Sequence, residues 1–278
     1  MGARLDYALS QFSRLPFFLG LWSRFPLGST RARIEYGILP YAHYAYGVFW
    51  SAMLASRLGI PRISAIEFGV AGGNGLVALE RNCKEIAAAT GVAIDVFGFD
   101  TGSGMPAPID YRDLPHIWGS GFYRMDVEKL RERLDKAELV LGDVDETVRQ
   151  WIEQRHAPIG FIAFDLDYYS STAAALRILA GDADSHLPRV HCYFDDVTSN
   201  DLGCMNPYVG ELLAIREFND RWPDRKICRI ELLRVHRPRW EKWQDRMFAF
   251  HDFPHPLYTR LVIPNEDEAR QLPLRGPG

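Results

Sequence analysis

Two pairs of aspartates are notable because each pair directly follows a run of apolar residues. Asp165 and Asp167 come after one such run, and Asp195 and Asp196 come after another. Short apolar runs are typical of buried strands, and the carboxyl ends of parallel strands meet at one edge of a sheet. Four carboxylates brought together there repel one another unless a proton or a cation neutralises them. Since hard oxygen ligands favour Mg²⁺, Ca²⁺ or Mn²⁺ over zinc, the pattern indicates a site for a divalent cation.

Helix capping is the simpler explanation for any one of these aspartates. An aspartate before a helix often accepts a hydrogen bond from the first turn, and Asp167 or Asp196 taken alone could serve this purpose. Capping does not explain why all four carboxylates follow two strands of the same predicted sheet. Their convergence therefore favours the cation site.

A glycine-rich turn provides a second candidate site. Gly69, Gly73 and Gly75 follow the apolar run 63–68 and precede a helical stretch. Glycines in such a turn let the backbone bend sharply and let a ligand approach it closely. Asp100 ends the next predicted strand, where a carboxylate can accept hydrogen bonds from two ribose hydroxyls. The sequence thus predicts a nucleoside-binding site beside the aspartates.

The choice of nucleoside depends on Glu67, which lies just before the turn. Residues 73–78 also fit the dinucleotide fingerprint GxGxxA, and a dinucleotide would place its pyrophosphate near Glu67. A carboxylate facing a pyrophosphate is unfavourable, whereas one facing the ammonium or sulfonium group of S-adenosylmethionine is favourable. Glu67 therefore favours S-adenosylmethionine over NAD.

The motifs resemble those of a known group of enzymes. The string Asp165-x-Asp167-x-Tyr169-x-Ser171-Thr172, followed by Asp195-Asp196, resembles the macrocin O-methyltransferase (TylF-like) family. These are class I, metal-dependent methyltransferases that use S-adenosylmethionine to methylate sugar hydroxyls of natural products. Three further blocks are similar to that family: Glu67-Phe-Gly-Val, Phe99-Asp100-x-x-x-Gly104-Met-Pro106 and Gly142-Asp143-x-x-Glu146-Thr147. The resemblance covers roughly residues 62 to 200.

The resemblance implies a role for each carboxylate. It implies metal ligands at Asp165, Asp195 and Asp196, a general base at Asp167, ribose contacts at Asp100 and an adenine contact at Asp143. Further cofactor contacts are expected at Glu67, Gly69, Gly73 and Gly75. The implied cofactors are S-adenosyl-L-methionine and Mg²⁺ or another hard divalent cation. Leu166 departs from the family, in which a glycine is more common at that position.

A missing lysine bears on the acceptor. Catechol-type metal-dependent methyltransferases place a lysine base close to their first metal aspartate, but no lysine occurs between Lys136 and Lys226. This absence favours an aliphatic, sugar-like hydroxyl, although His186 or His191 could still serve as a base. We therefore expect a small-molecule hydroxyl substrate whose proton is accepted by Asp167.

The elements that must hold these residues alternate along the chain. Predicted strands cover residues 63–68, 92–99, 137–141, 159–164 and 190–194, and predicted helices cover residues 76–90, 127–136, 144–155, 171–180 and 211–221. This alternation predicts an α/β, Rossmann-like fold of the class I methyltransferase type, with a mostly parallel sheet and helices on both faces. Two strand-like segments with no clear helix between them, 227–235 and 247–253, predict a C-terminal antiparallel hairpin at the sheet edge.

The chain divides into three predicted regions. Residues 1–60 are expected to form a helical lid or oligomerisation segment, 61–264 the methyltransferase domain and 265–278 a flexible tail. The segment 36–55 is nearly free of charge and about long enough to span a bilayer, but it contains Pro40 and four tyrosines. We therefore expect a buried or interfacial helix there, with a homo-oligomer contact through the N-terminal aromatic residues and no membrane span.

Composition restricts the partners and the compartment. The 278 residues carry a net charge of −4, which argues against a nucleic-acid binder that relies on a broad basic surface. The four cysteines are scattered and form no CxxC pair, so neither a zinc knuckle nor a disulfide framework is expected. Reduced thiols of this kind are typical of a cytoplasmic protein.

Three other functions remain open. Asp165-Leu-Asp167 is also a DxD motif, with which a metal-dependent glycosyltransferase could hold a nucleotide sugar. Such an enzyme explains neither the glycine turn nor the pair Asp195-Asp196. An NAD-dependent oxidoreductase would use the glycine turn but needs no metal cluster. A methyltransferase-like fold could also serve only as a binding module.

Overall fold

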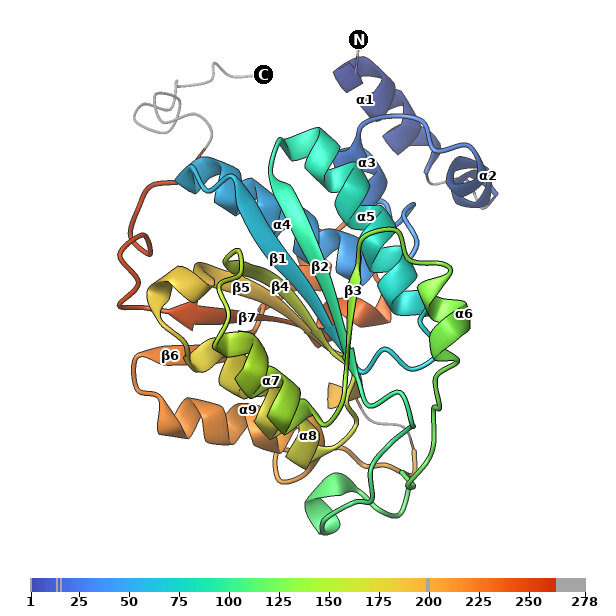
Figure 1. The fold of residues 1–278 in the computed structure, drawn as a ribbon. Helices are drawn as coiled ribbons and strands as arrows, with labels where there is room; N and C mark the ends of the chain where they lie inside the picture. Colours follow the sequence, from blue (N-terminus) through green and yellow to red (C-terminus); the bar gives the residue numbers. More distant parts are fainter. Residues whose placement is uncertain (1, 14, 16, 199–200, 264–278) are drawn as a thin grey trace.

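A seven-stranded sheet organises the chain (Figure 1), and the computed structural model describes residues 2–13, 15, 17–198 and 201–263. The strand order is β3-β2-β1-β4-β5-β7-β6. The strands are β1 (Arg62–Phe68), β2 (Ala93–Asp100), β3 (Glu138–Leu141), β4 (Ile159–Phe164), β5 (His186–Phe194), β6 (Arg225–Arg229) and β7 (Met247–Asp252). Strands β1 to β5 pair in parallel, as the alternation of strands and helices predicts.

The strand order reverses at the centre of the sheet, since the chain runs outward from β1 to β3 and then returns to β4 on the other side of β1. In open α/β sheets, ligands bind at this reversal, outside the carboxyl ends of the strands. Both predicted groups of functional residues follow β1, β2, β4 and β5, so the topology places them at this edge.

The predicted C-terminal antiparallel hairpin is confirmed, with a different internal order. β7 pairs antiparallel with both β5 and β6, so the last strand lies inside the sheet and β6 forms its edge. β6 also ends at Arg229, six residues before the predicted end at 235. Leu232 has a φ of 55°, a left-handed conformation that no strand can contain, and residues 233–236 form a 3₁₀ turn.

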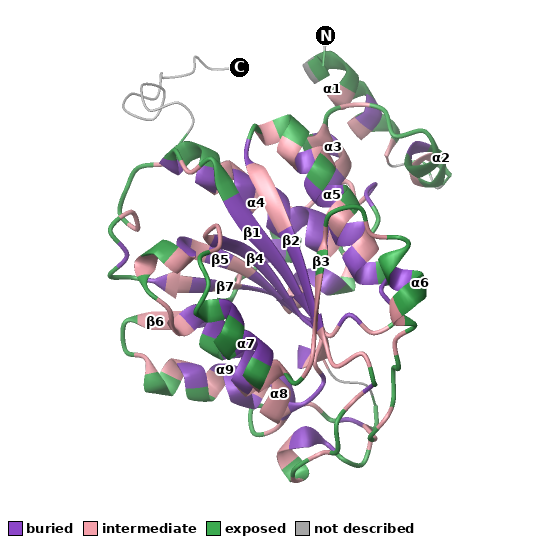
Figure 2. Ribbon diagram, viewed as in Figure 1, coloured by how far each residue is buried: buried purple, intermediate pink, exposed green. Residues whose placement is uncertain are grey.

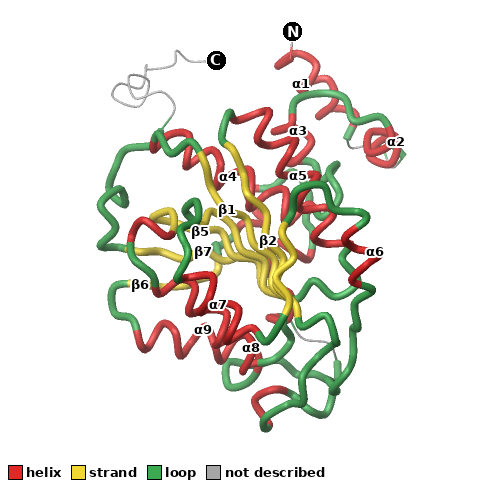
Figure 3. The backbone as a smooth tube through the Cα atoms, viewed as in Figure 1, coloured by secondary structure: helices red, strands yellow, loops and turns green. Residues whose placement is uncertain are grey.

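Helices cover both faces of the sheet, as predicted (Figures 1 and 3). One face carries α3 (Thr30–Glu35), α4 (Ala42–Leu58) and α5 (Asn74–Thr90), and the other carries α7 (Val144–Ile152), α8 (Tyr169–Ala175) and α9 (Gly210–Arg221). The shorter helices are α1 (Gly2–Phe12), α2 (Phe18–Arg24) and α6 (Val127–Arg131). Each element of the predicted central region is present.

Helix α6 is five residues shorter than the predicted helix 127–136. The Glu80 carboxylate on α5 accepts the backbone N–H groups of Asp135, Lys136 and Ala137 at 3.0, 2.5 and 2.5 Å. These three N–H groups therefore point at a side chain rather than at helical carbonyls, and the chain turns into β3. Local propensity could not reveal a contact between residues more than fifty positions apart.

Strands β1 and β4 are buried on both faces (Figure 2), which is why their sequences are mostly apolar and do not alternate between apolar and polar residues. At their carboxyl ends, the rings of Phe68 and Phe164 stack with centroids 5.5 Å apart. The ring of Phe164 stacks in turn on that of Phe194 at 4.5 Å. A stack of three buried rings thus fixes the ends of β1, β4 and β5, from which the candidate site is built.

Helix α4 packs directly on the sheet. Ser51 Oγ donates a hydrogen bond to the Gly160 carbonyl at 2.5 Å, and Gly47 leaves room for the ring of Phe161, which would lie 2.3 Å from an added Cβ. The charge-free segment 36–55 therefore supplies a buried helix of the core. The predicted boundary at residue 60 stays a prediction, and residues 265–278 lie outside the described residues.

No helix in the described ranges is both long and apolar enough to cross a bilayer. Cys83 and Cys192 are buried, whereas Cys204 and Cys228 are exposed, and all four are free thiols. The expected cytoplasmic location stays a prediction from the cysteine pattern.

Stability at acid pH is expected to depend on His186, whose side chain is 0% exposed. Burial lowers the pKa of His186 to about 4, against about 6.5 in an unfolded chain. Between these values the unfolded chain binds a proton that the folded protein does not, so stability is full above about pH 6.5 and is lost as the pH falls toward 4. The loss attributable to this group is about 3 kcal/mol.

Urea denaturation between pH 7 and pH 4 checks this expectation. His186→Gln should flatten the pH dependence of the free energy of unfolding, whereas His116→Gln, at an exposed position, should leave it unchanged. Equal slopes in the wild type and in His186→Gln would contradict the assignment.

Candidate active site

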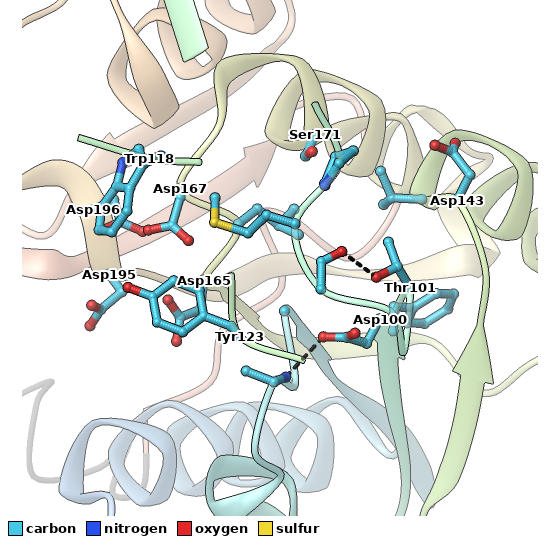
Figure 4. Close-up of a pocket in the computed structure, with 18 of the residues that line it drawn as sticks. Asp100, Thr101, Trp118, Tyr123, Asp143, Asp165, Asp167, Ser171, Asp195 and Asp196 are labelled. Carbon is cyan, nitrogen blue, oxygen red and sulfur yellow. Dashed lines mark hydrogen bonds between the residues drawn. The ribbon is translucent and has the colours of Figure 1, made fainter. Parts of the chain in front are cut away.

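A cavity of about 370 Å³ opens at the carboxyl ends of the parallel strands (Figure 4). Its volume lies in the range of small-molecule pockets. Seven of the ten predicted site residues line it: Gly69, Asp100, Asp143, Asp165, Asp167, Asp195 and Asp196. The nucleoside-binding and acidic residues predicted separately from the sequence therefore belong to one cavity.

Three carboxylates in this cavity are close enough to hold one ion. Asp165, Asp195 and Asp196 each offer one oxygen atom, and these atoms lie within 4.8 Å of one another. Asp165 extends β4 beyond its last residue, and its N–H donates to the Phe68 carbonyl at 3.0 Å. Asp195 and Asp196 begin a 3₁₀ turn (Asp195–Val197) at the end of β5. The convergence expected from adjacent strand ends is thus what brings these side chains together. We call these three residues the cation site.

The carboxylates of the cation site disfavour one another's charge. Burial, with the charges of Asp195 and Asp167, raises the pKa of Asp165 to about 8, although Arg246 opposes the rise. Burial and the same carboxylate neighbours raise the pKa of Asp196 well above its ordinary value. Because the ionised forms of these carboxylates are disfavoured, a cation bound among them would stabilise them.

The Asp195 carboxylate accepts hydrogen bonds from residues outside the predicted motifs. Its Oδ1 accepts hydrogen bonds from Tyr193 Oη at 2.6 Å and from Arg246 Nη1 at 2.5 Å. Arg246 is fixed in turn by its Nε, which donates to Thr198 Oγ1 at 2.8 Å. Because both contacts fall on Oδ1, the second oxygen of Asp195 keeps its acceptor capacity.

The residues present fit a hard divalent cation. Asp196 Oδ2 is buried and has no hydrogen-bond partner among the described residues, which is costly for a carboxylate oxygen unless a proton or cation meets it. The donor set consists of carboxylate oxygens alone, without histidine or cysteine. Such a set favours Mg²⁺ or Mn²⁺ over zinc.

Asp167 lies beside the cation site but has a different environment. Asp167 is 8% exposed, and the neighbouring Asp196 carboxyl offsets part of the rise that burial causes in its pKa. Its φ of 59° is left-handed, a conformation that aspartate tolerates better than most residues. The turn after β4 thus places its left-handed residue at Asp167, so Leu166 needs no glycine there.

The opposite end of the cavity carries the two predicted nucleoside contacts. Asp100 accepts the N–H groups of Ala71 at 2.8 Å and of Gly102 at 2.7 Å, one on each carboxylate oxygen. Each oxygen retains a second lone pair, so the two backbone contacts fix the carboxylate without exhausting it. Asp143 caps α7 by accepting the Asp145 N–H at 2.8 Å, and it lines the cavity as well.

Three predicted cofactor residues do not line the cavity: Glu67, Gly73 and Gly75. Glu67 is 2% exposed, accepts a hydrogen bond from Tyr44 Oη at 2.8 Å, and has a pKa that burial raises well above its ordinary value. A Cβ on Gly75 would lie 2.0 Å from Glu67 Oε1, and one on Gly73 would lie 2.3 Å from the Leu130 side chain. Packing of these buried neighbours is sufficient to require both glycines. A cofactor contact at the three residues stays a prediction.

Gly69→Ala is expected to destabilise the protein by about 3 kcal/mol or more. Gly69 has a φ of 84°, and an added Cβ would lie 1.8 Å from the Asp165 carbonyl oxygen, a backbone atom that cannot move aside easily. Gly91→Ala is the matched control, because Gly91 also has a positive φ, 74°, but no atom within 4 Å of an added Cβ. It should cost only the backbone strain of about 1–2 kcal/mol. Equal losses in urea denaturation would contradict the proposed clash.

Two aromatic residues of the cavity were not predicted from the sequence. Trp118 and Tyr123 line it from the long loop between β2 and α6, visible in Figure 3. This loop is folded on itself by hydrogen bonds from Met105 N to the Phe122 carbonyl and from Gly121 N to the Met105 carbonyl, both of 2.8 Å. The length of this loop is the sequence feature that could have indicated a functional role, since long irregular loops in compact domains are usually functional.

The two histidines considered as alternative bases lie elsewhere. His186 begins β5, at the end of the strand away from the cavity, and His191 Nδ1 lies 3.0 Å from Ser51 Oγ on α4. Neither lines the cavity, and the described residues that line it include no lysine. Asp167 is therefore the better candidate for a base.

No family model and no curated protein matches the sequence. Among solved structures, the O-methyltransferase NovP aligns with a TM-score of 0.51 at 15% identity, covering 76% of this chain and 79% of that chain. The calicheamicin methyltransferase CalS11 aligns with a TM-score of 0.48 at 20% identity, covering 90% of this chain and 91% of that chain. An O-methyltransferase from Bacillus cereus in complex with SAH aligns with a TM-score of 0.36 at 17% identity, covering 73% and 78%. The strand order and the likeness to NovP show the Rossmann-like fold of the class I methyltransferases.

Proposed function

We propose that this protein is an S-adenosylmethionine-dependent O-methyltransferase of the macrocin type. It acts, with the help of a divalent cation, on a hydroxyl of a sugar-like natural product. The observation that carries the proposal is the union in one cavity of a ribose-type carboxylate, Asp100, with the three carboxylates of the cation site. The fold shared with NovP agrees with it, and NovP is described as an O-methyltransferase.

The cation site and the nucleoside end have separate tasks. Asp165, Asp195 and Asp196 would hold Mg²⁺ or a similar ion, which when bound supplies a Lewis acid that lowers the pKa of an acceptor hydroxyl. Asp100 would hold the ribose of S-adenosylmethionine, and Asp143 would lie near its adenine. Methyl transfer is an in-line displacement, so the residues at the two ends of the cavity must fix both reactants on one axis.

Asp167 would accept the proton that leaves the acceptor hydroxyl. An ordinary aspartate, with a pKa of about 3.9, is a weak base. Burial raises the pKa of Asp167 to about 6, which makes its carboxylate a stronger proton acceptor near neutral pH. No lysine is among the described lining residues, which agrees with this assignment and with a sugar-like rather than a catechol acceptor. Trp118 and Tyr123 add an aromatic wall against which the apolar face of a sugar ring could pack.

Calorimetry with S-adenosylhomocysteine, NAD and UDP-glucose tests this function against its two enzymatic alternatives. We expect S-adenosylhomocysteine to bind and the other two ligands not to bind. Binding of UDP-glucose in the presence of Mn²⁺, without binding of S-adenosylhomocysteine, would instead favour the glycosyltransferase. Binding of NAD alone would favour the oxidoreductase.

The N-terminal helices support the expected homo-oligomer. Large apolar side chains of this region are exposed, including Tyr7 at 69%, Phe17 at 89% and Phe25 at 58%. Exposed apolar side chains gathered in one region are typical of protein interfaces. Light scattering on the full chain and on a variant with Tyr7, Phe17 and Phe25 changed to serine tests whether a second copy covers them.

A further inference from the structure

A fifth carboxylate lies next to the aspartates of the candidate active site. Glu211 is the second residue of α9, and it is 0% exposed. Its Oε2 accepts the backbone N–H of Asp196 at 3.0 Å. This bond joins the start of α9 to the turn that carries Asp195 and Asp196, two residues of the cation site.

Two oxygen atoms at this junction have no hydrogen-bond partner among the described residues, namely Glu211 Oε1 and Asp196 Oδ2. Both are buried, and desolvation of such an atom without a partner costs free energy. Because ionised carboxylate oxygens only accept hydrogen bonds, the two cannot satisfy each other without a proton or a cation. The guanidinium of Arg246 does not supply the charge, since it is bonded to Asp195 and Thr198.

The environment of Glu211 is dominated by the same carboxylates. Burial, and then the charge of Asp196, raises the pKa of Glu211 well above its ordinary value, and Asp165 and Asp167 add to the rise. Gly210, which precedes it, has a φ of 55°, and an added Cβ there would lie 3.6 Å from the Asp167 carbonyl. The start of α9 is therefore packed beneath the turn after β4 as well as bonded to the turn after β5.

We infer that Glu211 is a positioning residue of the cation site. It holds the turn at Asp195 and Asp196 through the Asp196 N–H, and its buried carboxylate adds negative charge that stabilises the bound cation. The inference rests on the proposed function, because it needs a cation at Asp165, Asp195 and Asp196. Mutation of residues that hydrogen-bond to metal ligands and orient them typically lowers metal affinity by about 10- to 100-fold.

Glu211→Gln separates charge from shape. The amide keeps the size of the side chain and an oxygen that can accept the Asp196 N–H, but it removes the negative charge. We expect calorimetry to show Mn²⁺ affinity weakened by about tenfold or more, with the affinity for S-adenosylhomocysteine unchanged. Without metal, Glu211→Gln should melt at or above the wild-type temperature, because the amide is neutral like the protonated carboxyl that burial favours. Its rise in Tm on adding Mn²⁺ should be smaller.

The melting temperatures distinguish this role from a purely structural one. A structural hydrogen bond alone predicts the same rise in Tm on adding Mn²⁺ in Glu211→Gln as in the wild type, and that result would overturn the inference. An Mn²⁺ affinity within about twofold of wild type would overturn it too. Asp220→Asn, an exposed change on the same helix, is the control and should alter neither quantity.

Two further measurements keep the inference separate from the proposed function. If Glu211→Gln does not fold, Glu211→Ala is measured in its place, and wild-type Mn²⁺ affinity there would overturn the inference. A wild-type protein that binds S-adenosylhomocysteine but not Mn²⁺ contradicts the cation site, and the inference with it. Binding of both ligands with no effect of Glu211 contradicts the inference alone.

Discussion

Asp195→Ala is expected to lower kcat/KM for methyl transfer by about 10³-fold or more, and to leave the affinity for S-adenosylhomocysteine within about threefold of wild type. Asp195 supplies one of three oxygens that lie within 4.8 Å of one another, and two monodentate carboxylates hold a hard cation poorly. A bound Lewis acid contributes several kcal/mol to the stability of developing negative charge. The substitution does not alter Asp100 or Asp143, which lie at the nucleoside end of the cavity. Steady-state kinetics and calorimetry check the two halves of the expectation.

A chelator should reproduce the effect in the wild type. Excess EDTA is expected to abolish transfer, and added Mg²⁺ or Mn²⁺ to restore it, while S-adenosylhomocysteine still binds. Asp184→Ala, an exposed aspartate just before β5, is the matched control and should remain fully active. Full wild-type activity in excess chelator would remove the cation from the proposed function.

The convergence of the aspartates could be predicted because it depends only on topology. Asp165 and Asp195 each follow a buried apolar strand, and parallel strands must present their carboxyl ends at one edge of the sheet. The same rule brings Asp100 into the cavity from β2 and Gly69 from β1. None of these placements requires knowledge of a side-chain rotamer.

The roles of the glycines could not be predicted from the sequence in the same way. Gly73 and Gly75 fit a cofactor-binding pattern, yet the structure shows that Leu130 and Glu67 occupy the space beside them. A glycine motif indicates that some group lies close to the backbone, but it does not identify that group. The approaching groups here are side chains of the protein itself, from α6 and β1.

The residues behind the cation site could not be predicted at all. Arg246 reaches Asp195 across 51 positions of sequence, and Glu211 reaches Asp196 across 15. Neither belongs to a spacing pattern, because the contacts arise from the antiparallel return of β7 and from the packing of α9. The surroundings of a charged site are set by tertiary packing, whereas its principal ligands are set by strand ends.

Asp167→Asn is expected to reduce kcat by about 10²- to 10⁴-fold, the usual contribution of a general base. The substitution suits this position, because asparagine tolerates the left-handed backbone, φ 59°, that Asp167 adopts. It keeps the shape of the side chain but removes its negative charge and its capacity to take a proton. The kcat is therefore measured at saturating Mn²⁺, and the affinity for S-adenosylhomocysteine should stay close to wild type, which separates loss of a base from loss of the site.

The pH profile provides the sharper test of the same role. Burial raises the pKa of Asp167 to about 6, and a base must be deprotonated to act, so wild-type kcat should be high above that pH and fall as the pH drops. A bound cation favours the ionised carboxylate, so with Mg²⁺ present the fall begins at or below about pH 6. Asp167→Asn has no carboxyl to titrate, and its residual rate should not follow this fall. An unchanged kcat, or the same acid limb in both proteins, would show that the proton leaves by another route.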